Sequence, residues 1–102
     1  MIKDFIINVS DEQISNINSK IKSYPWSSIE DMEGWNHGTN KNYLKELCEY
    51  WVSDFDWKKH EKLINSFSNF KTNVDDIDLH FIKELGSGDN PKPLLLMHYF
   101  LQ

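Results

Sequence analysis

The stretch Gly34–Trp57 reads GWNHGTNKNYLKELCEYWVSDFDW and contains three of the four tryptophans and the single cysteine of the chain. Its beginning is rich in glycine and polar residues, which predicts a loop over Gly34–Thr39. Apolar residues then recur at helical spacings, which predicts an amphipathic helix that stops at the DFDW corner. Asn40 is the expected N-cap of this helix, with Thr39 as the alternative.

The apolar side of this helix and the aromatic residues of the neighbouring loops together predict a packing face. Large side chains of this kind gain about 1.5–3 kcal/mol each on burial. Cys48 belongs to the same helical side and is expected to be a small apolar residue rather than a reactive thiol. For the loop tryptophans, packing is favoured over a ligand-stacking pair, because no polar constellation accompanies them. The packing face comprises Trp26, Trp35, Tyr43, Leu44, Leu47, Trp51, Phe55 and Trp57.

Two further helices are predicted around this one. Residues Phe5–Val9 alternate in polarity and form an extended lead. Ser10 and Gln13 then have the spacing of a capping box, and the helix that follows must end before Pro25. A third helix is predicted over Trp57–Asn65.

The lysines near the start of the third helix are interleaved with acidic residues. Lys58, Lys59 and Lys62 lie close to Asp56 and Glu61 in the sequence. This mixture of signs is typical of a solvated helix face and does not form a basic binding patch.

The pattern changes to strand periodicity from residue 67 onwards. Two alternating runs flank Asp75 and Asp76, which predicts a β-hairpin. A loop over Glu84–Pro93 leads to the apolar run Leu94–His98, which has the composition of a strand buried on both faces. The predicted fold class is therefore α+β, with about three helices followed by a hairpin and one further buried strand. Residues 1–66 would form a helical meander and residues 67–102 the first strands of an unfinished sheet.

Bulk composition narrows the function classes. The chain has 102 residues, enough for one small domain, and its net charge of −5 argues against a nucleic-acid binder. No signal peptide or membrane anchor is expected, so a soluble cytoplasmic protein is predicted. The four histidines are irregularly spaced and no phosphate loop, CxxC or nucleophile elbow occurs, so we expect no metal, no cofactor and no catalytic residue.

Several segments, in order, resemble the N-terminal region of epoxide hydrolases of the microsomal type, which have the α/β-hydrolase fold. The matching pieces cover almost the whole chain. They read FIINVSDEQ (5–13), PW (25–26), GWNHGT (34–39), NYLKELCEYW (42–51), DFDW (54–57), FKTNVDDIDLHFI (70–82) and PLLLMH (93–98).

The resemblance implies a meander that wraps a catalytic domain and leads into an HGWPG motif of the oxyanion hole. The family's nucleophilic aspartate, acid histidine and lid tyrosines lie further on, and none is present here. After His98 the chain reads YFLQ instead of GWPG, so His98 is at most a remnant of the oxyanion motif. The family's hairpin usually turns on Asp-Gly, whereas this chain has Asp75 and Asp76. The resemblance thus implies a truncated segment that is inert by itself.

Two functions are predicted from these observations. In the first, the chain is a structural segment whose packing face covers the catalytic domain of an α/β-hydrolase, which is missing here. In the alternative, it is a stand-alone interaction module that binds a partner or itself. The alternative rests on residues Leu94–Met97, an open apolar edge of the kind that recruits other chains.

Overall fold

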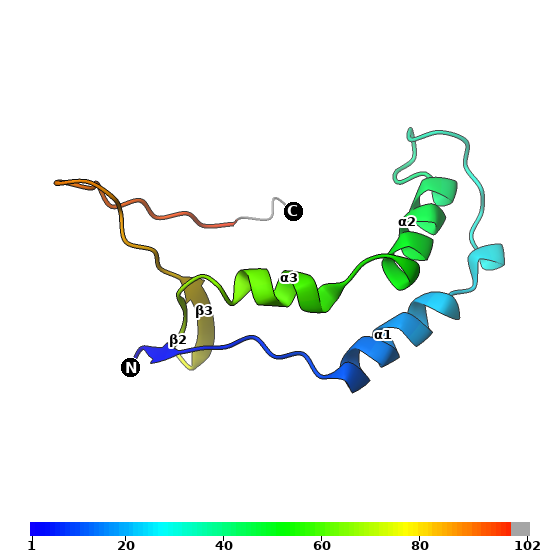
Figure 1. Cartoon of the computed structure of the whole chain (residues 1–102). Helices are drawn as coiled ribbons and strands as arrows, with labels where there is room; N and C mark the ends of the chain where they lie inside the picture. Colours follow the sequence, from blue (N-terminus) through cyan, green and yellow to red (C-terminus); the bar gives the residue numbers. More distant parts are fainter. Residues whose placement is uncertain (99–102) are drawn as a thin grey trace. The chain divides into compact units, whose positions relative to one another are not determined.

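The computed structural model describes residues 1–98, in which three α-helices precede a small antiparallel sheet (Figure 1). This arrangement confirms the predicted α+β class. The predicted departure from the oxyanion motif at residues 99–102 lies outside the described residues. The elements in chain order are β1 (Lys3–Asp4), α1 (Asp11–Lys22), a short 3-10 turn (Trp26–Ser28), α2 (Lys41–Ser53), α3 (Trp57–Ile64), β2 (Asn69–Val74) and β3 (Ile77–Ile82).

The chain divides into two compact units. One unit is the helical segment Ile7–Ile64, and the other combines residues 1–6 with the chain from residue 65 onwards. In the helical unit α1 contacts α2. In the other unit the strand order is β1-β2-β3, because the N-terminal residues pair with the hairpin.

Helix α1 begins with the predicted capping box. The Ser10 hydroxyl accepts a hydrogen bond from the Gln13 backbone N–H at 3.2 Å, and the Gln13 side-chain oxygen accepts one from the Ser10 N–H at 3.1 Å. Both contacts satisfy N–H groups that a helix start leaves without intrahelical partners. The first turn also carries Asp11 and Glu12, which complement the helix dipole.

Helix α2 begins at Asn40, the expected N-cap. The Asn40 side-chain oxygen accepts a hydrogen bond from the Tyr43 N–H at 3.0 Å. The amide nitrogen of the same side chain donates to the Gly34 carbonyl at 3.3 Å, so this residue also holds the preceding loop. Gly34 and Gly38 both adopt positive φ values, which glycine tolerates without steric cost.

The predicted hairpin forms around Asp75 and Asp76. Their φ values are +50° and +62°, and the register pairs Val74 with Ile77. Two consecutive positive φ values are the geometry of a two-residue type I′ turn, which suits the strand twist but strains residues with a Cβ. The two-residue turn thus forms although both of its residues carry a Cβ.

Alternation along the hairpin gives the sheet one apolar side. Phe70 stacks on Phe81, with ring centroids 5.6 Å apart. The register places the pairs Thr72–Leu79 and Val74–Ile77 on the same side. This sheet face comprises Phe70, Thr72, Val74, Ile77, Leu79 and Phe81.

The prediction of a further buried strand at residues 94–98 is wrong. Residues 94–97 adopt no regular structure, and their side chains are 81–83% exposed. A strand buried on both faces needs neighbouring strands and covering layers. The sheet of the described residues contains only β1, β2 and β3, and it offers no such site.

Residues 1–98 bury no apolar side chain. The two buried residues are polar: Glu61 is 7% exposed and Asn69 is 6% exposed. By contrast, large apolar side chains on α2, on the sheet and in the segment after it remain partly in water. The units thus have local structure without an apolar core.

Replacing Asp76 with glycine should strengthen the hairpin, because glycine adopts the positive φ without the Cβ clash. The expected gain is about 1 kcal/mol, which slows hydrogen exchange of the β2–β3 backbone amides about fivefold. Asp76→Ala, which keeps a Cβ, is the matched control and should give no such slowing. Equal protection in the two variants would show that strain at this residue is negligible.

Candidate functional site

The side of α2 predicted to pack is present as an exposed surface. Its side chains Tyr43, Leu44, Leu47 and Trp51 are 37–52% exposed. They fall at helical spacings and therefore share one side of the helix. Cys48 is a free, half-buried thiol on this helix. The helix thus presents a preformed, partly exposed apolar surface.

One end of this surface continues into an apolar groove. The groove has a volume of about 250 Å³ and almost entirely apolar walls. Its residues come from the lead segment, α1, α2, the connection between α2 and α3, and the start of α3. We name it the α1–α2 groove; its lining comprises Val9, Ile14, Ile17, Asn18, Trp51, Phe55 and Trp57.

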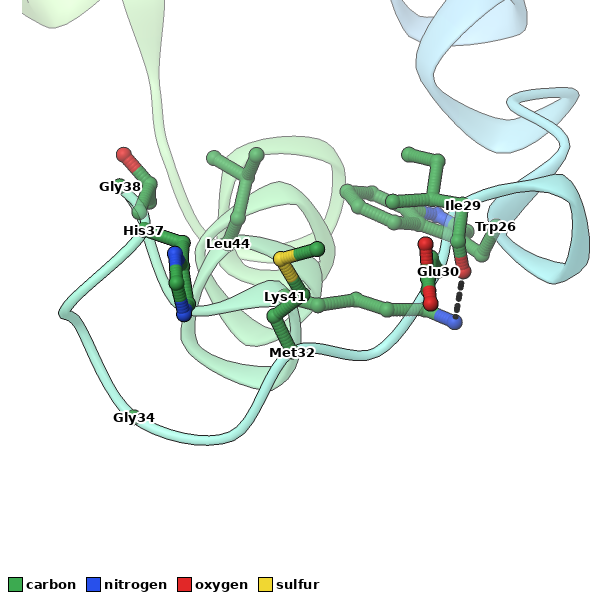
Figure 2. A pocket seen from close by; sticks show the side chains of 10 residues that line it. Trp26, Ile29, Glu30, Met32, Gly34, His37, Gly38, Lys41 and Leu44 are labelled. Carbon is green, nitrogen blue, oxygen red and sulfur yellow. Dashed lines mark hydrogen bonds between the residues drawn. The ribbon is translucent and has the colours of Figure 1, made fainter.

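A second hollow of about 160 Å³ lies where the loop before α2 passes over the helix (Figure 2). Trp26, Ile29 and Leu44 give it apolar walls, and Glu30, His37 and Lys41 add polar groups. The Lys41 ammonium donates to the Ile29 carbonyl at 2.8 Å. Lys41 thus ties the loop to the helix.

The two loop tryptophans contact different aromatic rings. Trp35 lies against Tyr43 of α2, with centroids 5.2 Å apart, and Trp26 lies edge-on to Tyr24 at 4.8 Å. Within residues 1–98, no described ring contact joins the two tryptophans to each other.

Glu61 of α3 is buried, so the prediction of a solvated face is wrong at this residue. Its carboxylate accepts hydrogen bonds from the Val9 N–H at 2.8 Å and the Trp57 indole N–H at 3.1 Å. It also pairs with the Lys58 ammonium at 3.0 Å. The Val9 N–H is the main cause that lowers the pKa of Glu61 below its ordinary value, and burial opposes this. Trp57 and Glu61 are one helical turn apart, and this spacing is the sequence feature from which their contact could have been predicted.

The described residues contain no metal-binding cluster and no helix that could cross a membrane. No group of three or more His, Cys, Asp or Glu side chains within residues 1–98 could hold a metal ion. None of the described helices is long and apolar enough to cross a membrane. His98 lies in the exposed segment after the sheet.

Comparison with known proteins gives these exposed faces a context. The chain matches the family described as "Epoxide hydrolase N terminus" over residues 2–100. It is 36% identical over 101 residues to epoxide hydrolase 1 of Oryctolagus cuniculus and 35% identical over 103 residues to the juvenile hormone epoxide hydrolase of Manduca sexta. Each alignment covers 95% of this chain and 22% of the relative.

Solved structures agree with the sequence comparison. The juvenile hormone epoxide hydrolase of the silkworm Bombyx mori matches with a TM-score of 0.72 and 25% identity, over 80% of this chain and 20% of that one. The Aspergillus niger epoxide hydrolase has the same fold over 78% of this chain, with a TM-score of 0.67 and 24% identity. The fold is therefore that of an N-terminal segment from the α/β-hydrolase superfamily.

The chain belongs to the epoxide hydrolase N-terminus family. It spans about a fifth of the length of the curated relatives it matches, 22% in each of the two named above.

Proposed function

We propose that this chain is the structural N-terminal segment of an epoxide hydrolase, inert alone, and that its packing face covers an α/β-hydrolase catalytic domain. One observation carries the proposal: the described residues bury no apolar side chain, although they expose an ordered apolar helix face. A surface of this kind is characteristic of an interface.

The size of the exposed surface supports docking to a large partner. Each big apolar side chain contributes about 1.5–3 kcal/mol when fully removed from water. The α2 side of the packing face presents four such residues, and the sheet face of the other unit presents more. This chain matches only about a fifth of each relative, and the remaining part of the relative would supply the covering surface.

We expect no catalytic activity because residues 1–98 contain no described set of side chains arranged for catalysis. General acid–base or nucleophilic catalysis requires a nucleophile, a base and an orienting group within hydrogen-bonding reach. In residues 1–98 the buried carboxylate, Glu61, is already engaged by three donors. The free thiol of Cys48 lies on the packing face, where no described contact activates it.

The purified chain should not hydrolyse an epoxide. With styrene oxide as the probe, diol formation measured by chromatography should equal the rate in buffer alone. A rate that rises in proportion to the concentration of the chain would contradict the proposal. A catalytically competent epoxide hydrolase, assayed in parallel, verifies that the assay detects turnover.

Docking through α2 can be tested with the Oryctolagus cuniculus relative from which the matching N-terminal region has been removed. We expect the chain to bind this protein, and Leu47→Asp to weaken binding at least about tenfold, because the charge would be buried in an apolar contact. Lys45→Ser, on the polar side of the same helix, is the matched control. If both variants bind as tightly as the unmodified chain, α2 is not the docking face.

A second candidate function is self-association through residues 94–97. Their side chains Leu94, Leu95, Leu96 and Met97 are more than four fifths exposed in an irregular segment. Extended apolar backbone of this kind can pair with another chain. This candidate differs from the first in two ways: it uses residues 94–97 instead of the packing face, and the partner is a second copy of this chain.

Sedimentation distinguishes the second candidate from the first. If residues 94–97 drive association, the apparent mass should rise with protein concentration, and Leu95→Asp should restore the monomer. Leu85→Asp is a matched control, because Leu85 is 88% exposed and lies outside the run. A monomer at all concentrations, with no binding of a hydrophobic dye, would eliminate self-association.

A further inference from the structure

Glu61 is the only buried carboxylate in the described part of the chain, and two of its three hydrogen-bond donors belong to residues that line the α1–α2 groove. Its Oε2 atom accepts the Val9 N–H and the Trp57 indole N–H, at 2.8 and 3.1 Å. Its Oε1 atom accepts from the Lys58 ammonium at 3.0 Å. Val9 lies 52 positions earlier in the sequence, so the carboxylate joins distant parts of the helical unit.

Lys58 makes a second link to the backbone of Val9. Its ammonium donates to the Val9 carbonyl oxygen as well as to Glu61. The N–H and the C=O of Val9 are therefore both held by side chains of α3. This contact fixes the backbone of the lead segment just before the α1 cap, where the segment has no regular structure of its own.

The residues held by Glu61 also form walls of the groove. Val9 and Trp57 line the α1–α2 groove together with side chains of α1 and α2. The carboxylate binds the backbone of the first wall and the indole nitrogen of the second. One carboxylate thus contacts both walls.

We propose that ionised Glu61 is a positioning residue that holds Val9 and Trp57 as walls of the α1–α2 groove, and that loss of its charge releases the lead segment and opens the groove. The groove's part in docking rests on the proposed function, whereas the positioning itself is independent of it.

The chemistry of the acceptor explains why the charge is needed. A carboxylate accepts on both oxygens, so it can satisfy two N–H donors and an ammonium together. A neutral carboxyl or an amide can keep a carbonyl oxygen at the Oε2 position but places a donor at the Oε1 position. The Lys58 ammonium would then lose its acceptor, and the two hydrogen bonds at Oε2 would lose the strength that the charge gives them. The groups that face the carboxylate are Lys58 and Trp57 from α3 and the Val9 backbone from the lead segment, so Lys58 supplies the facing charge.

The direction of the pH effect follows from these contacts. The Val9 N–H above all, with Lys58 and Trp57, lowers the pKa of Glu61 below its ordinary value of 4.5 in the folded chain. The stabilisation is therefore fully present above pH 4.5, and it is lost as the pH falls through the lower, folded-state pKa. At neutral pH the Val9 and Trp57 walls are therefore held in place.

Nuclear magnetic resonance of the full chain tests this assignment. The Val9 amide proton and the Trp57 indole proton should shift together during an acid titration, with one common midpoint below pH 4.5. In Glu61→Gln both shifts should disappear, and the Val9 amide should exchange with solvent about tenfold faster or more. Glu46→Gln, an exposed site on α2, is the matched control and should leave both signals unchanged.

Trp57→Phe keeps the test decisive if Glu61→Gln does not fold. This variant removes one donor, so the Val9 amide should still titrate, at a higher pH than in the unmodified chain. Two results would overturn the proposal. One is a different midpoint for the Val9 amide proton and the Trp57 indole proton in the unmodified chain; the other is a Val9 amide signal that does not respond to the titration of Glu61. Neither result depends on docking. Failure of the proposed function would show in the binding experiment with Leu47→Asp and not in this titration.

Discussion

The position of the apolar side chains constrains everything else in this chain. In residues 1–98 only Glu61 and Asn69 are buried, while large apolar residues stay partly in water. Since apolar burial is the dominant favourable term in folding, local structure here must rest on interactions that need no core. Helix caps, a tight hairpin turn and backbone pairing supply them. These interactions define the elements but leave their apolar surfaces uncovered.

The two buried polar residues have similar structural roles in separate units. Glu61 holds the backbone of the lead segment in the helical unit. In the sheet unit, the Asn69 amide nitrogen donates to the Phe67 carbonyl at 2.8 Å, and its oxygen lies 2.8 Å from His80 Nε2. Because that oxygen can only accept, His80 Nε2 must carry the hydrogen. Each unit thus contains one buried polar residue that holds neighbouring groups by hydrogen bonds, while large apolar side chains stay partly exposed.

The sequence predicted those features whose causes are local. The Ser10–Gln13 capping box and the hairpin at Asp75 and Asp76 depend on neighbouring residues, and both are confirmed. The strand expected at residues 94–98 failed because a strand is defined by its neighbours, which periodicity does not reveal. Glu61 was missed for a similar reason: its main partner, Val9, is 52 positions away, and its neighbouring lysines suggested a solvated face.

The exposed apolar segments differ in how much order a partner must impose. Helix α2 is capped at Asn40 and regular to Ser53, so its apolar side is already arranged. Residues 94–97 have no regular structure, and fixing their backbone costs roughly 1–2 kcal/mol per residue. A preorganised surface retains more of its burial energy as affinity. Under the proposed function, the α2 side would therefore make the first contact with the catalytic domain, and residues 94–97 would add apolar area only after that contact has formed.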